Sequence, residues 1–320
     1  MKELLLLMTD FYGYNEDIIS ELEKQGWNVT WFQDKIPLNT AEGLVTKVLP
    51  KYKENKFNRY FHTCLESVKD KKYDLILIIF GALYLQKEHI SFLRKQFTDT
   101  KIVCYSWDSV KNIPLIKDLF RLSDVAYTFD SNDAIKYNVN FLPLFYSKNI
   151  CETPVIKYDI STVMSFFAEK AASLNEVITR LPSDCKSFIY LRIRTRRYLW
   201  KLKHFNKKKV QSLEKYFNLA SLPREEVLKI FAESKAVIDC PLPGQNGLTM
   251  RTFEVLSMGK KLITSNESIR NYDFYCKENI LIMPEEADRL ESFLELPFNR
   301  NYLMDSKYSV SSFVKTLTSV

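Results

Sequence analysis

Short apolar runs alternate with helix-length amphipathic stretches from one end of the chain to the other. In the first half, such runs predict strands at 3–8, 28–32, 74–80, 101–106, 124–129 and 139–142. Between the first two runs, Ile18, Ile19 and Leu22 recur at helical spacing, and Gly26 marks the end of that helix. This alternation is typical of a parallel sheet whose faces are covered by helices.

A second series of the same kind follows residues 143–158, a segment with two prolines and no clear periodicity. Its apolar runs predict strands at 160–166, 187–191, 236–240, 261–265 and 279–283. Helical spacing recurs near 171–181, 223–234, 249–258 and 285–295. We therefore expect two α/β domains, residues 1–150 and 151–320, with the linker at 143–158.

Composition removes several classes of protein from consideration. The 320 residues include seven glycines, and none has the spacing of the GxGxxG dinucleotide fingerprint or of the P-loop. The six cysteines form no CxxC pair and the three histidines lie far apart, which argues against a zinc site or a c-type haem. Cysteines such as Cys104 and Cys240 lie in apolar stretches, as free thiols do in a reducing compartment.

No stretch of the sequence approaches the roughly 18 apolar residues of a membrane span. The opening apolar run, residues 4–8, is too short for the core of a signal peptide. We expect a cytoplasmic protein that can bind peripherally to the inner face of a membrane.

The clearest signal for ligand binding follows the strand expected at 236–240. The next residues, 241–266, read PLPGQNGLTMRTFEVLSMGKKLITSN and predict a glycine loop and a helix that starts at Thr249. A helix N-terminus can hold a phosphate, and Arg251 adds a forked cation there. Glu254, one turn further on, can accept hydrogen bonds from a ribose diol. The alternative is a Thr-capped helix whose first-turn glutamate only complements the helix dipole.

The run QNGLTMRTFEVLSMGKKLITSN (245–266) resembles the nucleotide-sugar loop of bacterial GT-B-type glycosyltransferases, in particular the group related to CgeB-like and lipopolysaccharide or capsule biosynthesis proteins. The segments YDLILIIFG (73–81), VCYSWDSVKN (103–112), VAYTFDSNDA (125–134) and FLPLFY (141–146) resemble the same group. The resemblance implies two Rossmann-like domains facing a cleft, with the donor in the second domain and the acceptor in the first. It also implies that the last helix, about 308–320, packs back on the first domain.

By this resemblance the chain transfers a sugar from a nucleotide-sugar to a surface-polysaccharide acceptor, free or lipid-linked. The residues that we expect in donor binding, from the resemblance and from their positions after strands and at the helix start, are Asn246, Gly247, Thr249, Arg251, Glu254 and Arg192. Related retaining enzymes carry a Glu–x7–Glu pair, whose second glutamate matches Glu254, whereas Asn246 occupies the first position. The stereochemistry of transfer therefore stays open. Because no Asp-x-Asp triplet occurs, we expect a metal-independent reaction that needs no cofactor.

Carboxylates follow several strands of the first domain, and an inverting transfer needs one of them as a base. Asp10 is the first candidate, because in GT-B enzymes the loop after the first strand often supplies the base. Asp108 is the second candidate, with Trp107 as a platform for the acceptor sugar. Asp130 follows another strand and is expected beside the acceptor. For Asp10 and Asp108, the alternative is that each caps the following helix.

The net charge of +7 is concentrated in residues 186–209, which hold ten Lys or Arg and no acidic residue. Tyr198 and Trp200 are interleaved with these cations, a mixture that suits an anionic bilayer or a nucleic acid. Since no nucleic-acid motif is present, we favour a membrane and expect no nucleic-acid partner. Two alternatives stay open, a solvated helix face and cations such as Arg192 and Arg194 that reach the donor phosphates.

Two other functions fit the same architecture. A nucleotide-sugar epimerase would need the same diphosphate loop but no acceptor. A non-catalytic protein that binds a sugar nucleotide would need no base. Product analysis distinguishes the three, since it detects a transferred sugar, an epimerised sugar or no product.

Overall fold

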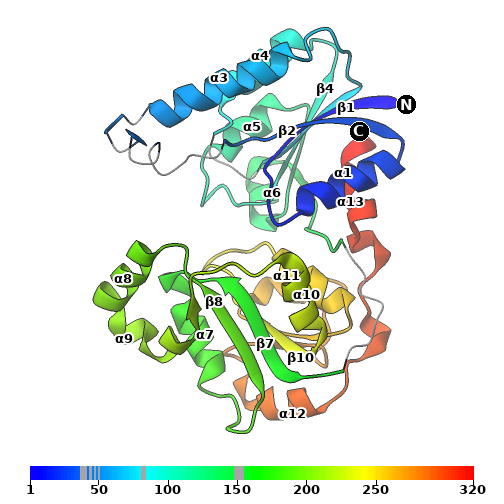
Figure 1. Cartoon of the computed structure of the whole chain (residues 1–320). Helices are drawn as coiled ribbons and strands as arrows, with labels where there is room; N and C mark the ends of the chain where they lie inside the picture. Colours follow the sequence, from blue (N-terminus) through cyan, green and yellow to red (C-terminus); the bar gives the residue numbers. More distant parts are fainter. Residues whose placement is uncertain (37–41, 43–44, 47, 50, 81–83, 148–154) are drawn as a thin grey trace. The chain divides into compact units, whose positions relative to one another are not determined.

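The computed structural model describes residues 1–36, 42, 45–46, 48–49, 51–80, 84–147 and 155–320. Gly81 and part of the expected linker lie outside these residues. The chain divides into two compact units (Figure 1). The first unit is Met1–Pro143 with Val310–Val320, and the second unit is Leu144–Ser309.

The first unit is built on a six-stranded sheet in the order β2-β1-β3-β4-β5-β6, and every neighbouring pair is parallel. Its strands are β1 (Lys2–Met8), β2 (Trp27–Phe32), β3 (Leu75–Phe80), β4 (Lys101–Ser106), β5 (Val125–Thr128) and β6 (Asn140–Phe141). Its helices are α1 (Tyr14–Lys24), α3 (Tyr52–Glu66), α4 (Lys87–Gln96), α5 (Ile116–Leu122), α6 (Ser131–Tyr137) and α13 (Val310–Thr318). All six strands expected in this half of the sequence are present.

The core of the first unit explains why its strands read as continuous apolar runs. All six residues of β3 are buried, because helices cover both faces of a parallel sheet. Helix α3 buries Phe57, Phe61 and Leu65, which recur every four residues and so form one stripe against the sheet. Gly26, with φ 88°, follows α1 in the left-handed conformation that glycine adopts readily.

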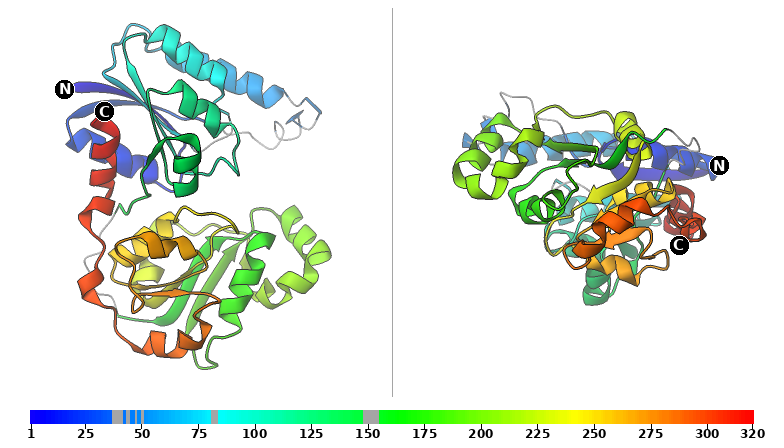
Figure 2. Two further views of the ribbon diagram at one scale, coloured as in Figure 1. Left: turned by 180° about the vertical axis from the view of Figure 1, so that it is seen from behind. Right: turned by 90° about the horizontal axis from the view of Figure 1, so that it is seen from below.

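The C-terminal helix α13 belongs to the first unit although it is the last element of the chain. It packs on α1, as both views in Figures 1 and 2 show. The rings of Phe313 and Tyr105 meet edge to face, with centroids 4.8 Å apart. Gln25 Nε2 donates a hydrogen bond to the carbonyl oxygen of Ser311 over 3.0 Å.

The second unit has a six-stranded sheet in the order β12-β11-β10-β7-β8-β9, again parallel throughout. Its strands are β7 (Tyr158–Ser165), β8 (Ser187–Arg192), β9 (Phe217–Asn218), β10 (Ser234–Asp239), β11 (Lys261–Thr264) and β12 (Ile280–Ile282). Its α-helices are α7 (Ala171–Ile178), α8 (Arg196–Phe205), α9 (Lys207–Val210), α10 (Arg224–Ala232), α11 (Met250–Ser257) and α12 (Leu290–Glu295). Short 3₁₀ turns join them, among them η1 (Ala168–Lys170) and η4 (Ala287–Arg289).

The structure confirms the predicted α/β class and differs from the sequence prediction in small ways. The two-residue strand β9 was not expected, because two residues carry no readable periodicity. The helix expected at 285–295 is divided into the 3₁₀ turn η4 and the helix α12. The chain therefore has two Rossmann-like domains, each built on one parallel sheet.

The two sheets reverse their strand order at different places. In the first unit the order turns at the pair β1 and β3, and in the second unit it turns at the pair β7 and β10. Ligands of open α/β sheets bind at the carboxyl ends of strands, next to such a reversal. These two sheet edges are therefore where a site is sought.

Candidate functional site

A buried carboxylate closes the reversal point of the second sheet. Asp239 is the last residue of β10 and only 1% of it is exposed. Its Oδ1 accepts from Arg251 Nη1 over 2.7 Å, and its Oδ2 accepts from the hydroxyls of Thr249 at 2.5 Å and Thr252 at 3.0 Å. A buried charge is tolerated when it is paired and hydrogen-bonded. Asp239 therefore ties the start of α11 to the end of β10.

Arg251 joins the two strands at this reversal. Besides Asp239, its guanidinium donates from Nη2 to the carbonyl oxygen of Val163 in β7 over 2.7 Å. Its buried Nε has no hydrogen-bond partner among the described residues. The sequence suggested that the Arg251 guanidinium faces a diphosphate, but in the structure both of its terminal nitrogens donate hydrogen bonds to protein oxygens. A diphosphate contact for Arg251 stays a prediction.

Lys170 is a functional candidate that the sequence reasoning missed. It is the last residue of η1, in the connection that leaves the carboxyl end of β7. Burial and the positive charge of Arg251 together lower its pKa to about 8, and Asp239 acts in the opposite direction. A lone lysine in a 3₁₀ turn gives no motif. Its place just after the first strand of the second domain was the available signal.

The glycine loop before α11 is held by residues that follow the next strand. The carbonyl oxygen of Asn246 accepts from Ser268 Oγ, and from Asn266 Nδ2 over 3.3 Å. The carbonyl oxygen of Gly247 also accepts from Asn266 Nδ2, over 3.4 Å. Thr249 is the N-cap of α11, as expected, but within the described part of the chain its side chain makes no capping hydrogen bond. Its hydroxyl is directed to Asp239 instead, so the threonine oxygen does not cover the first N–H groups of the helix.

Glu254 lies one turn after Arg251 and is directed to a different element. It is 5% exposed, and its Oε1 accepts from Arg224 Nη2 over 3.2 Å. Arg224 is the first residue of α10 and also donates to Ser147 Oγ. A ribose at Glu254 would therefore meet an ion pair rather than a lone carboxylate. Sequence reasoning did not single out Arg224, because it reads as the ordinary start of a helix after Pro223.

Arg192 is the last residue of β8 and lies opposite Ser165 of β7. Its carbonyl oxygen accepts from the N–H of Phe166 over 2.9 Å. Arg192 is thus at the same sheet edge as Asp239, two strands away across β7. Its predicted contact with the donor stays a prediction.

The edge of the first sheet carries different chemistry. Asp10 follows β1 and is exposed, and its carbonyl oxygen accepts from Lys35 Nζ over 3.1 Å. The next helix, α1, has Gly13 as its N-cap, so the capping alternative does not apply to Asp10. Tyr12 has φ 52°, a left-handed conformation that is uncommon for a bulky residue and marks a constrained turn.

Three aromatic rings gather at this edge, and we call Phe11, Tyr12 and Trp107 the aromatic patch. The ring centroid of Phe11 lies 4.7 Å from that of Tyr12 and 5.9 Å from that of Trp107. Phe11 is 45% exposed and Tyr12 is 42% exposed. The patch joins the loop after β1 to the loop after β4, far apart in the sequence.

Asp108 and Asp130 are both tied to the backbone of the first unit. Asp108 Oδ1 accepts from the N–H of Ser109 over 2.8 Å and from Asn112 Nδ2 over 2.9 Å. Burial raises the pKa of Asp108, and these two hydrogen bonds oppose that shift. Asp130 is 4% exposed and caps α6, accepting from the N–H groups of Asn132 and Asp133. The structure thus gives Asp130 a capping role, and its acceptor contact stays a prediction.

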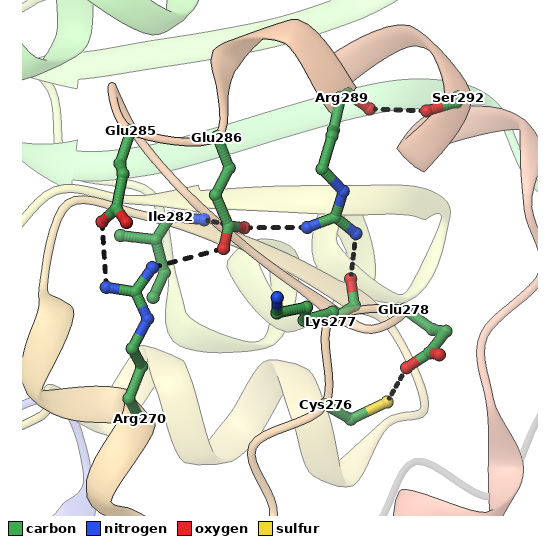
Figure 3. A network of polar contacts seen from close by, with 9 residues as sticks. All are labelled: Arg270, Cys276, Lys277, Glu278, Ile282, Glu285, Glu286, Arg289 and Ser292. Carbon is green, nitrogen blue, oxygen red and sulfur yellow. Dashed lines mark hydrogen bonds and ion pairs between the residues drawn. The ribbon is translucent and has the colours of Figure 1, made fainter.

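A network of charged side chains comes from the segments before and after β12 (Figure 3). Arg270 donates to Glu285 over 2.9 Å and to Glu286 over 3.3 Å. Arg289 donates to Glu286 over 3.1 Å and to the carbonyl oxygen of Lys277 over 3.0 Å. Two guanidinium groups and two carboxylates balance here, so the network fixes a loop and offers no excess charge to an anion.

Within the described ranges, no three His, Cys, Asp or Glu side chains form a group that could hold a metal ion. No described helix is long and apolar enough to cross a membrane. Metal independence stays a prediction, because it concerns the reaction.

No protein-family model matches this chain, and no curated protein sequence matches it. Solved structures do match. UDP-GlcNAc 2-epimerase from Methanocaldococcus jannaschii is 13% identical, with a TM-score of 0.56 and 100% of each chain covered. Anabaena HepE in complex with UDP-glucose is 9% identical, with a TM-score of 0.59 and 99% of this chain and 95% of that chain covered.

The catalytic domain of starch synthase IV from Arabidopsis thaliana, bound to ADP and acarbose, is 9% identical, with a TM-score of 0.56 and coverage of 100% and 95%. Identities this low are informative about the fold alone. The narrower resemblance to the CgeB-like and surface-polysaccharide group stays a prediction. Two parallel six-stranded sheets, each a Rossmann-like domain, give this chain the GT-B fold.

Proposed function

We propose that this protein is a glycosyltransferase that binds a nucleotide-sugar in its second unit and a saccharide acceptor in its first. The observation that carries the proposal is the pair of cations, Lys170 and Arg251, at the strand-order reversal of the second sheet. The similar structures add support, since HepE was solved with UDP-glucose and an epimerase of the same fold with UDP-GlcNAc and UDP.

In this proposal Lys170 and the first N–H groups of α11 hold the diphosphate. A nucleoside diphosphate leaves with negative charge, and fixed donors in a partly buried site stabilise that charge as it develops. Arg251 acts mainly as a positioning residue, because its bonds to Asp239 and Val163 fix the start of α11. Binding of the diphosphate would favour the charged form of Lys170.

The ribose is proposed to bind at Glu254, beside Arg224. A carboxylate oxygen accepts hydrogen bonds from a diol, and the Arg224 guanidinium pairs with the buried carboxylate. Asn246, Gly247, Thr249 and Arg192 complete the donor site that we expect. The carbonyl oxygens of Asn246 and Gly247 are already occupied by residues after β11, so the backbone path of this loop is set before any donor arrives.

The acceptor is proposed to bind on the aromatic patch, with Asp10 as the base. Apolar faces of sugar rings pack well on aromatic rings, and two rings of the patch are well exposed. In an inverting transfer, Asp10 takes the proton of the acceptor hydroxyl while the oxygen of that hydroxyl bonds to the anomeric carbon of the donor sugar. The bond from that carbon to the diphosphate oxygen breaks, and the nucleoside diphosphate leaves.

The acceptor class we propose is a growing surface polysaccharide, as in lipopolysaccharide, capsule or exopolysaccharide, free or lipid-linked, and the enzyme is proposed to be cytoplasmic. An epimerase of this fold would act without an acceptor. The exposed aromatic patch favours transfer, since an enzyme that only epimerises its donor has no use for a second sugar platform.

A donor panel with mass spectrometry tests the function. Incubation with UDP-, ADP- and other nucleotide-sugars should release the nucleoside diphosphate, faster with an oligosaccharide acceptor, and yield a transferred sugar. An epimerised nucleotide-sugar as the sole product would contradict the proposal.

Calorimetric titration with UDP and ADP tests the donor site. Lys170→Met should weaken binding of the better nucleotide by roughly 10- to 100-fold, the loss of one charged hydrogen bond. Lys186→Met is the matched control, because Lys186 is exposed at the opposite, amino end of β8. Equal affinities for the wild type and Lys170→Met would contradict this placement.

A further inference from the structure

Helices α8 and α9 carry a surface that the proposed reaction does not use. The inner side of α8 packs on the core of the second unit through Tyr198, Leu199 and Leu202. The outer side has two adjacent stripes at i, i+4 spacing, Arg196–Trp200–His204 and Arg197–Lys201–Phe205. Short α9 adds three exposed lysines directly after it. In Figure 1 the two helices lie next to each other on the β8 side of the second unit.

Large apolar side chains are exposed on this surface. Phe205 is 75% exposed and Trp200 is 52% exposed. The Trp200 ring stacks on His204 with centroids 4.3 Å apart, and Phe205 meets its edge at 5.9 Å. These three rings lie within the last six residues of α8 and form a largely apolar projection that water solvates poorly.

Cations surround this projection. Residues 194–209 contain eight Lys or Arg and no acidic residue. Lys203 pairs with Glu214 over 3.0 Å, whereas Arg196, Arg197, Lys201, Lys207, Lys208 and Lys209 are exposed. Outside the longer segment 186–209, which holds ten of the 46 basic residues, the chain has 36 basic and 39 acidic residues. The excess positive charge of the protein is therefore confined to that segment.

We infer that the outer face of α8 and α9 binds the surface of a bilayer that contains anionic lipids. Tryptophan and phenylalanine suit the depth of the lipid headgroups, and basic side chains around them bind lipid phosphates. Each cation close to an anionic bilayer multiplies partitioning about fivefold. The inference goes beyond the transfer reaction, because binding to lipid needs neither a donor nor an acceptor.

The ring geometry favours a bilayer over a nucleic acid. Single-stranded nucleic acids bind by stacking bases on open aromatic faces. Here His204 covers one face of Trp200 and Phe205 borders its edge, so the rings already stack on one another. A compact apolar projection inserts into lipid without the need for an open ring face.

Vesicle flotation of the full chain tests the inference. The protein should bind phosphatidylcholine vesicles that contain phosphatidylglycerol, and binding to pure phosphatidylcholine should be much weaker. Raising the salt from about 0.1 M to about 0.5 M should weaken binding at least tenfold, because the screening length shortens. Trp200 fluorescence should shift to shorter wavelength on binding, and the shift should be absent in Trp200→Phe.

Two sets of variants assign the binding to this surface. Lys201, Lys207 and Lys208 changed together to Ser should weaken binding by about 100-fold, whereas Lys71, Lys72 and Lys95, exposed on the first unit, should tolerate the same change. Trp200→Ser with Phe205→Ser should weaken binding at least tenfold, and Ile135→Ser with Leu296→Ser serves as the control for exposed apolar residues.

Unchanged binding of both α8–α9 variants would overturn the inference. Salt-sensitive binding to a single-stranded oligonucleotide that exceeds binding to vesicles, and is lost in the same variants, would overturn it in favour of a nucleic acid. UDP affinity should not change in either variant. If the same lysine changes weaken UDP binding while lipid binding persists, the cations serve the donor, and the inference is wrong although the proposed function stands.

Discussion

The carboxyl edges of the two sheets have the same architecture and opposite chemistry. In the second unit, Arg251 and the start of α11 bond to the buried Asp239, and Lys170 follows the neighbouring strand β7, so the edge is cationic and tightly bonded. In the first unit, the edge exposes the rings of Phe11 and Tyr12 beside Asp10. One edge suits a diphosphate, and the other suits a neutral ring and a proton transfer.

The two strand orders help to explain this difference. At the reversal between β7 and β10, Arg251 bonds to both strands. At the reversal of the first sheet, the loop after β1 instead meets the loop after β4 through Phe11 and Trp107. A shared fold therefore fixes where ligands bind, while the side chains at the strand ends decide which ligands they are.

The largest effect on catalysis is expected from loss of the proposed base, Asp10, at the edge of the first sheet. Asp10→Asn should lower kcat/KM for transfer by about 10²- to 10⁴-fold, the range for loss of a general base, and leave UDP affinity unchanged. Steady-state kinetics with the acceptor found in the donor panel measures this. If Asp108→Asn has the larger effect, the base is Asp108, and the acid limb of the rate profile should then lie at a raised pH, because burial raises the pKa of that carboxyl.

The second edge should be the one whose charges stabilise the fold. Asp239→Ala leaves Arg251 partly buried without its carboxylate and should lower the free energy of unfolding by about 3–5 kcal/mol. Urea unfolding followed by circular dichroism measures the change. Glu176→Ala, which removes a surface pair with Arg180 in the same unit, should cost about 1 kcal/mol or less. Equal losses of stability in the two variants would show that the Asp239–Arg251 pair stabilises the fold no more than the surface pair of Glu176 and Arg180.

The pH dependence of donor binding should distinguish the two edges. Burial and Arg251 lower the pKa of Lys170 to about 8, so its amine is charged below that pH and largely neutral above it. The free protein must then take up a proton to bind a diphosphate, and the Kd for UDP should rise by up to about tenfold per pH unit above 8. Titrations in buffers of different ionisation enthalpy should detect the proton. Lys170→Arg, which keeps its charge, should flatten the profile, and a flat wild-type profile would exclude Lys170 from the donor site.

The smallest effect is expected at the aromatic patch. Phe11→Ala should weaken acceptor binding by about 3- to 10-fold, corresponding to about 0.5–1.5 kcal/mol for one aromatic contact. Titration of an oligosaccharide monitored by nuclear magnetic resonance measures it. Phe205→Ala removes an exposed ring from the second unit and should leave acceptor binding intact. A loss of UDP affinity in Phe11→Ala would contradict the proposal that the donor binds at the second sheet edge and the acceptor at the first.

Much of the fold could be predicted from the sequence, because local patterns dictate it. The apolar runs 3–8 and 74–80 became β1 and β3, and Thr249 begins a helix that ends before Gly259, which has φ 66°. Propensity, capping and burial on one face act over a few residues, so a single sequence records them. The positions of Asp10 and Trp107 at strand ends follow from the same patterns.

The partners of the site residues were decided by the tertiary structure. Arg251 is directed to Asp239, 12 residues earlier, and Glu254 to Arg224, 30 residues earlier, although the sequence placed both on one helical turn facing a ligand. Lys170 is significant because it follows β7, and β7 pairs with β10, a strand that lies about 75 residues later in the sequence. Burial lowers its pKa, and burial depends on what packs around the amine. A side chain's type is written in the sequence, but its partner and its solvation are set by chain segments that only folding brings together.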